Sequence, residues 1–150
     1  MYLYNYFCGN NRYTGNWYGY YIINEGNKVI IKQESWKIKL SITNKLSVYV
    51  ETIQDSKLTF NGILYEESGK VIAIVKANEY EETVICRYSL PIPGNDKLLI
   101  GLYSGLDFNG IAAVGPTIIS RDILDNAKVT TLINNNLEID VNSKVIRTKF

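Results

Sequence analysis

The stretch Gly15-Asn16-Trp17-Tyr18-Gly19-Tyr20-Tyr21-Ile22-Ile23 decides the fold of this chain. Its alternate positions, Trp17, Gly19, Tyr21 and Ile23, all lie on one face of an extended strand. A tryptophan near the start of a first strand plugs one end of a small barrel, and a glycine two residues later lets the strand bend as the sheet closes. The stretch therefore predicts the first strand of a closed β-barrel, which is the architecture of a container or a receptor.

Short β segments separated by turn residues continue to about residue 120. We expect a long second strand from Val29 to Ile42 that bends or bulges near Glu34 and Ser35, because regular alternation begins only at Trp36. Six further strands are expected over residues 46–53, 58–65, 71–76, 83–90, 98–103 and 111–120. The chain is predicted to be all-β, a single small antiparallel up-and-down barrel of about eight strands, with a β-sandwich as the alternative.

The expected organisation has three parts: an N-terminal segment over residues 1–12, the barrel over 13–121, and a C-terminal helix and tail over 122–150 that pack on the barrel. Ser120 is expected to cap a helix from Asp122 to Ile133, and the tail to form one more hairpin. Inward-facing side chains are expected to include those of Trp17, Tyr21, Trp36, Ile38 and Leu40.

Composition limits the range of partners. The chain has 150 residues with 16 Lys and Arg against 15 Asp and Glu, so general adhesion to DNA, RNA or an anionic membrane is not expected. The two cysteines, Cys8 and Cys86, show no CxxC spacing, and no secretory leader or membrane span is visible. These features favour a cytoplasmic location, with Cys86 as a buried apolar residue.

The chain contains no histidine, which removes Ser-His-Asp and Cys-His catalysis and histidine-ligated zinc. Ser104 therefore has no imidazole to activate it, and the sequence has no phosphate-binding loop and no acidic metal loop. We expect no catalytic residue, no metal and no cofactor, and an enzyme is the least favoured class of function.

Three elements resemble a known family: Gly15-x-Trp17-x-Gly19-x-Tyr21, Gly101-x-Tyr103-x-Gly105-x-Asp107-x-x-Gly110, and Gly115-Pro116-x-Ile118-Ile119-Ser120-Arg121. Over residues 13–122 they look like the receptor barrel of two-transmembrane β-barrel effectors in bacterial CBASS antiphage defence. The resemblance implies a barrel that senses a cyclic di- or trinucleotide and responds by forming homo-oligomers that disrupt the inner membrane. The Gly-x-Trp opening is also similar to that of lipocalins and fatty-acid-binding proteins.

One departure from that family is plain, because this chain begins almost at the first strand, where the family has two membrane helices. The resemblance thus allows a receptor domain separated from its anchor, a soluble relative, or a sponge that only sequesters the messenger. A membrane partner is expected only if the native protein carries an anchor that this chain lacks.

A cyclic dinucleotide requires aromatic platforms for its bases and Arg or Lys for its phosphates. Each aromatic candidate is more often core filling than a binding platform, and each arginine can instead form an internal ion pair or point outward. Asp107 is expected to pair with Arg121 or to bind a base edge or a ribose hydroxyl. The candidate ligand-binding residues are Tyr21, Trp36, Arg87, Tyr88, Tyr103, Ser104, Asp107 and Arg121, of which Arg87, Tyr103, Asp107 and Arg121 are expected to converge at one end of the barrel or on a contiguous groove.

Two classes of binding function remain open, a cyclic-nucleotide receptor that acts by ligand-driven assembly and a lipocalin-like carrier of an apolar small molecule. Both act through binding energy, in the first case through a change of association state or of the loop from Asp107 to Gly110.

Overall fold

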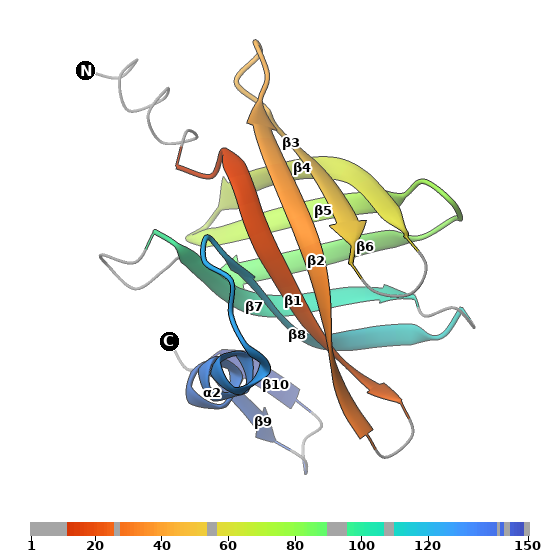
Figure 1. Ribbon diagram of the computed structural model, residues 1–150, viewed down its shortest axis with the longest axis vertical. Helices are drawn as coiled ribbons and strands as arrows, with labels where there is room; N and C mark the ends of the chain where they lie inside the picture. Colours follow the sequence, from red (N-terminus) through yellow and green to blue (C-terminus); the bar gives the residue numbers. More distant parts are fainter. Residues whose placement is uncertain are drawn as a thin grey trace.

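Eight antiparallel strands follow one another around a closed barrel, and β1 completes it by pairing with β8 (Figure 1). The computed structural model describes residues 12–25, 28–53, 57–89, 96–106, 110–140, 142 and 145–148. The barrel strands are β1 Gly15–Glu25, β2 Lys28–Leu40, β3 Leu46–Thr52, β4 Thr59–Glu67, β5 Lys70–Ala77, β6 Thr83–Ser89, β7 Leu98–Leu106 and β8 Ala112–Ser120. They are followed by helix α2, Asn126–Asn136, and by the hairpin of β9, Leu137–Asp140, and β10, Val145–Thr148. The prediction of an all-β, eight-stranded antiparallel barrel is confirmed.

Of the bend or bulge expected near Glu34 and Ser35, the bulge is absent. The ladder between β1 and β2 runs without interruption from the Gly15–Ile38 pair to the Glu25–Lys28 pair. At Glu34, β2 instead loses its other neighbour, because β3 ends opposite it at Thr52. The Ile53 N–H still donates to the Gln33 carbonyl at 3.1 Å, and the alternation changes because the residues before Gln33 form a ladder with β1 alone, in a two-stranded ribbon that extends past the barrel wall.

Trp17 closes one end of the barrel, as the sequence predicts. Its side chain is only 1% exposed, and its indole Nε1 donates a hydrogen bond of 2.8 Å to the carbonyl of Tyr13. The guanidinium carbon of Arg121 lies 3.9 Å from the centre of the Trp17 ring. The same guanidinium donates hydrogen bonds to the backbone carbonyls of Arg12, Thr14 and Asn16. A cation stacked on an indole and bonded to three carbonyls joins the end of β8 to the start of β1.

Apolar side chains fill two separate regions, one inside the barrel and one on its outer face. Trp17, Trp36 and Ile38 are buried in the interior, as expected, while Tyr21 and Leu40 are half-buried. On the outer face, α2 and the start of β9 cover β1, β7 and β8 (Figure 1). The residues of this second cluster are Tyr20, Ile100, Ile118, Val129, Ile133 and Leu137.

The helix begins later than predicted. Asp125, and not Ser120, is the N-cap, and its side chain accepts a hydrogen bond of 2.7 Å from the backbone N–H of Lys128. The chain before it is held out of the helix, because the backbone N–H of Leu124 donates to the Tyr20 hydroxyl at 2.8 Å. The helix also extends through Asn134–Asn136, because Ile133 and Leu137 pack on the barrel and keep this turn regular. The further hairpin predicted in the tail is present as β9 and β10.

None of the helices in the described part of the chain has the length and apolar character required to span a membrane.

Arg121 and Arg87 provide a matched test of the sealed end. Replacing Arg121 by alanine removes the cation over Trp17 and three hydrogen bonds, so we expect the free energy of unfolding to fall by about 2–4 kcal/mol. Arg87 is exposed on the outer face of β6, so Arg87→Ala is expected to change it by less than about 0.5 kcal/mol. Urea unfolding followed by tryptophan fluorescence measures both. Equal effects of the two substitutions would contradict the role assigned to Arg121.

Candidate ligand-binding site in the barrel interior

The eight residues predicted to bind ligand fall into separate places. Four of them, Tyr21, Trp36, Tyr88 and Tyr103, face the barrel interior, in alternation with outward neighbours. Asp107 lies outside the described residues.

The other three described candidates lie away from the interior, so the predicted convergence of Arg87, Tyr103 and Arg121 is not found. Arg87 stands between the buried, inward-facing Cys86 and Tyr88 and is therefore exposed on the opposite side of the wall. Ser104 is exposed for the same reason, next to the inward-facing Tyr103. Arg121 is engaged by backbone carbonyls at the sealed end.

Glu34 is the interior residue that the sequence reading missed. It lies two positions before Trp36 on the same face of β2, and its Oε2 accepts a hydrogen bond of 2.9 Å from the Trp36 indole N–H. Burial raises the pKa of Glu34 to about 7, and the Trp36 hydrogen bond lowers it by less than burial raises it. The sequence does indicate that Glu34 faces inward, because it alternates in phase with Trp36, Ile38 and Leu40.

Side chains fill the interior next to the sealed end, whereas those farther from it are partly accessible to solvent. Trp36 and Tyr88 are 3% and 0% exposed, and their rings meet edge to face at 6.3 Å. Tyr21 and Tyr103 also meet edge to face, at 5.6 Å and 79°, but both are half-buried, as is Glu34. Glu34 and Tyr21 lie at the last pairs that β2 makes with β3 and β1 makes with β8, so these inward-facing side chains are accessible at the mouth of the barrel. Glu34, Tyr21 and Tyr103 therefore line the accessible part of the interior.

Two glycines make room for these side chains. A Cβ at Gly19 would lie 2.5 Å from Trp36 Nε1 and 3.1 Å from Glu34 Oε2. A Cβ at Gly115 would lie 2.9 Å from the Tyr103 hydroxyl, which donates a hydrogen bond of 2.9 Å to the carbonyl of Ile22. The Gly19 motif thus serves the close approach of Trp36 and Glu34, where the sequence suggested a bend of the strand.

Tyr103 closes a gap in the wall. β1 pairs with β8 only from Tyr18–Ser120 to Tyr21–Thr117, and the bond from Tyr103 to Ile22 lies just beyond the last of these pairs. The hydroxyl is satisfied by the main chain, so the ring is the part of Tyr103 that remains for a ligand.

A second carboxylate, Glu82, lies between β5 and β6 and is 8% exposed. It accepts a hydrogen bond of 3.0 Å from the backbone N–H of Leu106 and another from the Tyr80 hydroxyl. Burial and nearby acidic groups raise the pKa of Tyr103 to about 12, and likewise that of the buried Cys86 thiol. The interior is consequently acidic in character, with neutral phenols and a neutral thiol around Glu34.

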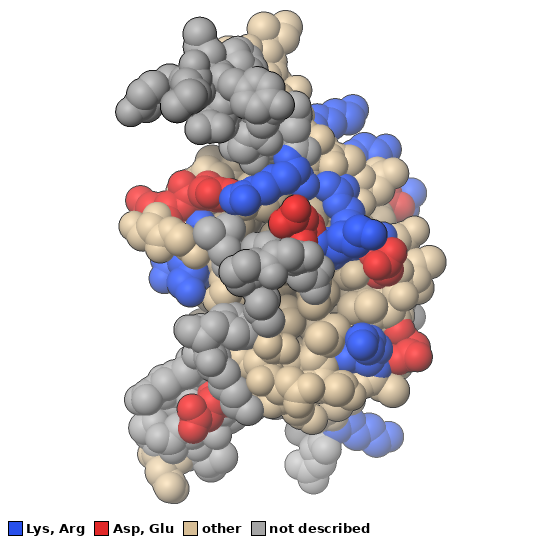
Figure 2. Space-filling view, turned by 90° about the vertical axis from the view of Figure 1, so that its left-hand side faces the viewer, with Lys and Arg blue, Asp and Glu red and all other residues tan. Residues whose placement is uncertain are grey.

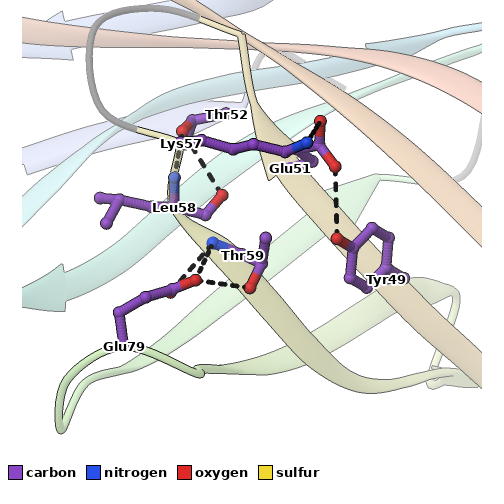
Figure 3. A network of polar contacts seen from close by, with 7 residues as sticks. All are labelled: Tyr49, Glu51, Thr52, Lys57, Leu58, Thr59 and Glu79. Atoms are coloured by element: carbon purple, nitrogen blue, oxygen red, sulfur yellow. Dashed lines mark hydrogen bonds and ion pairs between the residues drawn. The ribbon is translucent and has the colours of Figure 1, made fainter.

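The end opposite Trp17 has a fixed edge formed by the connections that follow β3 and β5 (Figure 3). The Glu79 carboxylate accepts hydrogen bonds from the Thr59 backbone N–H at 3.0 Å and from its hydroxyl at 2.7 Å, which hold the pKa of Glu79 below its ordinary value. Nearby, the Thr52 hydroxyl accepts a bond of 2.9 Å from the Leu58 N–H. The Glu79 contacts join the β5–β6 connection to the start of β4, and the Thr52 contact joins the two ends of the β3–β4 connection.

Charges outside the barrel show no comparable bias. On the face drawn in Figure 2, Lys and Arg side chains are interspersed with Asp and Glu, as a net charge of +1 suggests. In the part of the chain that the structure describes, no group of three His, Cys, Asp or Glu side chains is placed to hold a metal ion.

Comparisons with known proteins do not place the chain in a family. No protein-family model matches it, and no curated protein matches it. Several solved structures are similar to it, among them two with the following likeness. The siderocalin Ex-FABP, described as functioning through dual ligand specificities, is 12% identical, with 83% of this chain and 82% of that chain covered and a TM-score of 0.47. Lobster apocrustacyanin A1 is 16% identical, with 92% and 77% covered and a TM-score of 0.47. At identities of 12% and 16%, neither similarity indicates a function for this chain. A function has to be argued from the side chains of the barrel.

Replacing Glu34 by glutamine should change how stability depends on pH. The pKa of Glu34 is raised in the folded state from 4.5 to about 7, so its protonated form contributes stability below about pH 4.5, and this contribution is lost as the pH rises through 7. Relative to Glu34→Gln, the wild type should lose up to about 3 kcal/mol over this range. Urea unfolding at several pH values measures the difference.

The matched control is Glu67→Gln, which removes an exposed carboxylate from β4 and should follow the wild-type profile. A constant difference between wild type and Glu34→Gln at all pH values would show that folding does not raise the pKa of Glu34.

Proposed function

We propose that this protein binds a small organic molecule inside the barrel and acts by binding it, as a carrier or a receptor. The observation that supports the proposal is the half-buried state of Glu34, Tyr21 and Tyr103 inside a closed barrel. An enclosed, mainly apolar space with a few placed polar groups is the usual form of a small-molecule site.

The path of entry follows from the two ends. Trp17 and the Arg121 guanidinium fill the end at the start of β1, so a ligand enters from the opposite end, past the edge held by Glu79 and Thr59. Deep binding stops at Trp36 and Tyr88, because both are fully packed.

A cyclic di- or trinucleotide is the second candidate ligand, favoured by the half-buried ring pair of Tyr21 and Tyr103, which offers stacking surface for a base. Glu34 opposes it, because a phosphate next to a buried carboxylate is repelled. Arg87 and Arg121 do not face the interior, so such a ligand would need its phosphates at the rim. Ligand-driven assembly and a nucleotide-sponge role both depend on this second candidate.

Ala113 and Val114 are neighbours on β8 that test where the ligand sits. Ala113 is half-buried and in phase with the inward-facing Gly115 and Thr117, whereas Val114 is 61% exposed. Phenylalanine at position 113 should fill the accessible space and abolish binding, while Val114→Phe should bind like wild type. The probe is the neutral dye N-phenyl-1-naphthylamine, whose fluorescence rises on entering an apolar site.

Far-UV circular dichroism checks that Ala113→Phe is folded, and Ala113→Leu is a smaller replacement if it is not. Thermal shifts with cyclic dinucleotides and with fatty acids compare the two candidate classes of ligand. Undiminished dye binding in a folded Ala113 variant would move the site out of the barrel, and a wild type that binds neither the dye nor any of these ligands would overturn the proposal.

A further inference from the structure

We infer that the interior takes an organic cation, a protonated amine carried on a compact aromatic or apolar body, with Glu34 as its counter-ion and the rings of Tyr21 and Tyr103 beside it. This inference rests on the proposed interior site and specifies its ligand.

The carboxylate of Glu34 has unused capacity. Its Oε2 accepts the Trp36 hydrogen bond at 2.9 Å, but a carboxylate offers about four acceptor positions on two oxygens. Among the described residues, the ion pairs of Arg12 with Glu66 and of Lys57 with Glu51 do not involve Glu34, and the Arg121 guanidinium is stacked on Trp17 at the sealed end. The ionised form of a half-buried carboxylate is stabilised by an opposite charge and by further hydrogen bonds, and a cationic ligand supplies both.

The groups around Glu34 disfavour an anionic ligand. Tyr21, Tyr88, Tyr103 and Cys86 face the same interior and are neutral, since burial raises the pKa of each. Glu82 adds a second carboxylate toward the rim. Lys32 lies on the same face of β2 nearer the rim and is half-buried. The pKa of Glu34 itself is governed by burial and by the Trp36 hydrogen bond.

Aromatic rings complete the recognition of a cation. Tyr21 and Tyr103 meet at 79°, so one ring presents its edge to the face of the other. The faces of such rings carry negative potential, which attracts an ammonium group within about 6 Å. A charged amine between the carboxylate and these rings is favoured by both, whereas a neutral body of the same shape gains only from burial.

Binding of a cation must also release a proton from Glu34 when that carboxyl group is protonated. Glu34 pairs with an ammonium only when ionised, so below its own pKa the bound amine drives off the proton that Glu34 carries. The proton passes to the buffer and no bond within the ligand changes. A neutral ligand of the same shape releases none.

Isothermal titration calorimetry on the full chain tests the inference with 2-phenylethylamine and its neutral counterpart, 2-phenylethanol. At about pH 7.5 we expect the wild type to bind the amine at least about tenfold more tightly than the alcohol, and Glu34→Gln to lose this preference. At about pH 6, repeating the titration in two buffers of different ionisation enthalpy should show release of up to about one proton with the amine and none with the alcohol.

Glu67→Gln, which removes the same charge from the surface, should retain the preference and the proton release. Equal affinity for amine and alcohol in the wild type, or an unchanged preference in Glu34→Gln, would overturn the inference. If the naphthyl dye binds inside the barrel and the amine is not preferred over the alcohol, the interior site stands and only the preference for a cation is contradicted. If none of these probes binds, both the interior site and its preference for a cation are contradicted.

Discussion

The stacking of Arg121 on Trp17 is the interaction on which the rest of the structure depends. The ladder between the first and last strands of the barrel contains only the pairs from Tyr18–Ser120 to Tyr21–Thr117, so closure relies on other contacts as well. The Arg121 guanidinium supplies them by covering the indole and by holding the carbonyls of Arg12, Thr14 and Asn16. It thereby gives the barrel one sealed end, which is the reason that we propose entry of a ligand from the opposite end.

Above this seal, the fully buried rings of Trp36 and Tyr88 are followed by the half-buried side chains of Glu34, Tyr21 and Tyr103. Trp36 links these two groups, because its ring packs on Tyr88 and its indole N–H reaches Glu34. A carboxyl group kept in this position costs folding energy when ionised, which is reflected in its raised pKa. Natural chains retain such costs most often where a ligand or a reaction needs the group. This reasoning joins the fold to the proposed binding of a small molecule.

The barrel was predictable because alternation in strands is local. Trp17, Trp36 and Ile38 identify the inward face directly, and the turn residues between them separate the strands. Arg121 was misjudged because its partners, the carbonyls of residues 12–16, lie more than a hundred positions away in sequence. Arg87 was predictable in principle, since its neighbours Cys86 and Tyr88 already occupy the inward face. Glu34 was missed because its enclosure depends on Gly19, Tyr21 and Tyr103 together, which only the closed barrel brings around it. The helix started late because Tyr20, on a distant strand, holds Leu124.

The chain has two tryptophans, so its indole N–H groups give two NMR signals, one for each level of the barrel. The Trp17 N–H donates to the carbonyl of Tyr13 and the Trp36 N–H donates to Glu34. A proton–nitrogen correlation spectrum followed from acidic to alkaline pH is the most direct test of an accessible, titrating site at Glu34. We expect the Trp36 signal to move with a midpoint of about pH 7 and to move again when an interior ligand is added, while the Trp17 signal stays in place. A Trp36 signal that responds to neither pH nor ligand, or a Trp17 signal that moves with it, would contradict this account.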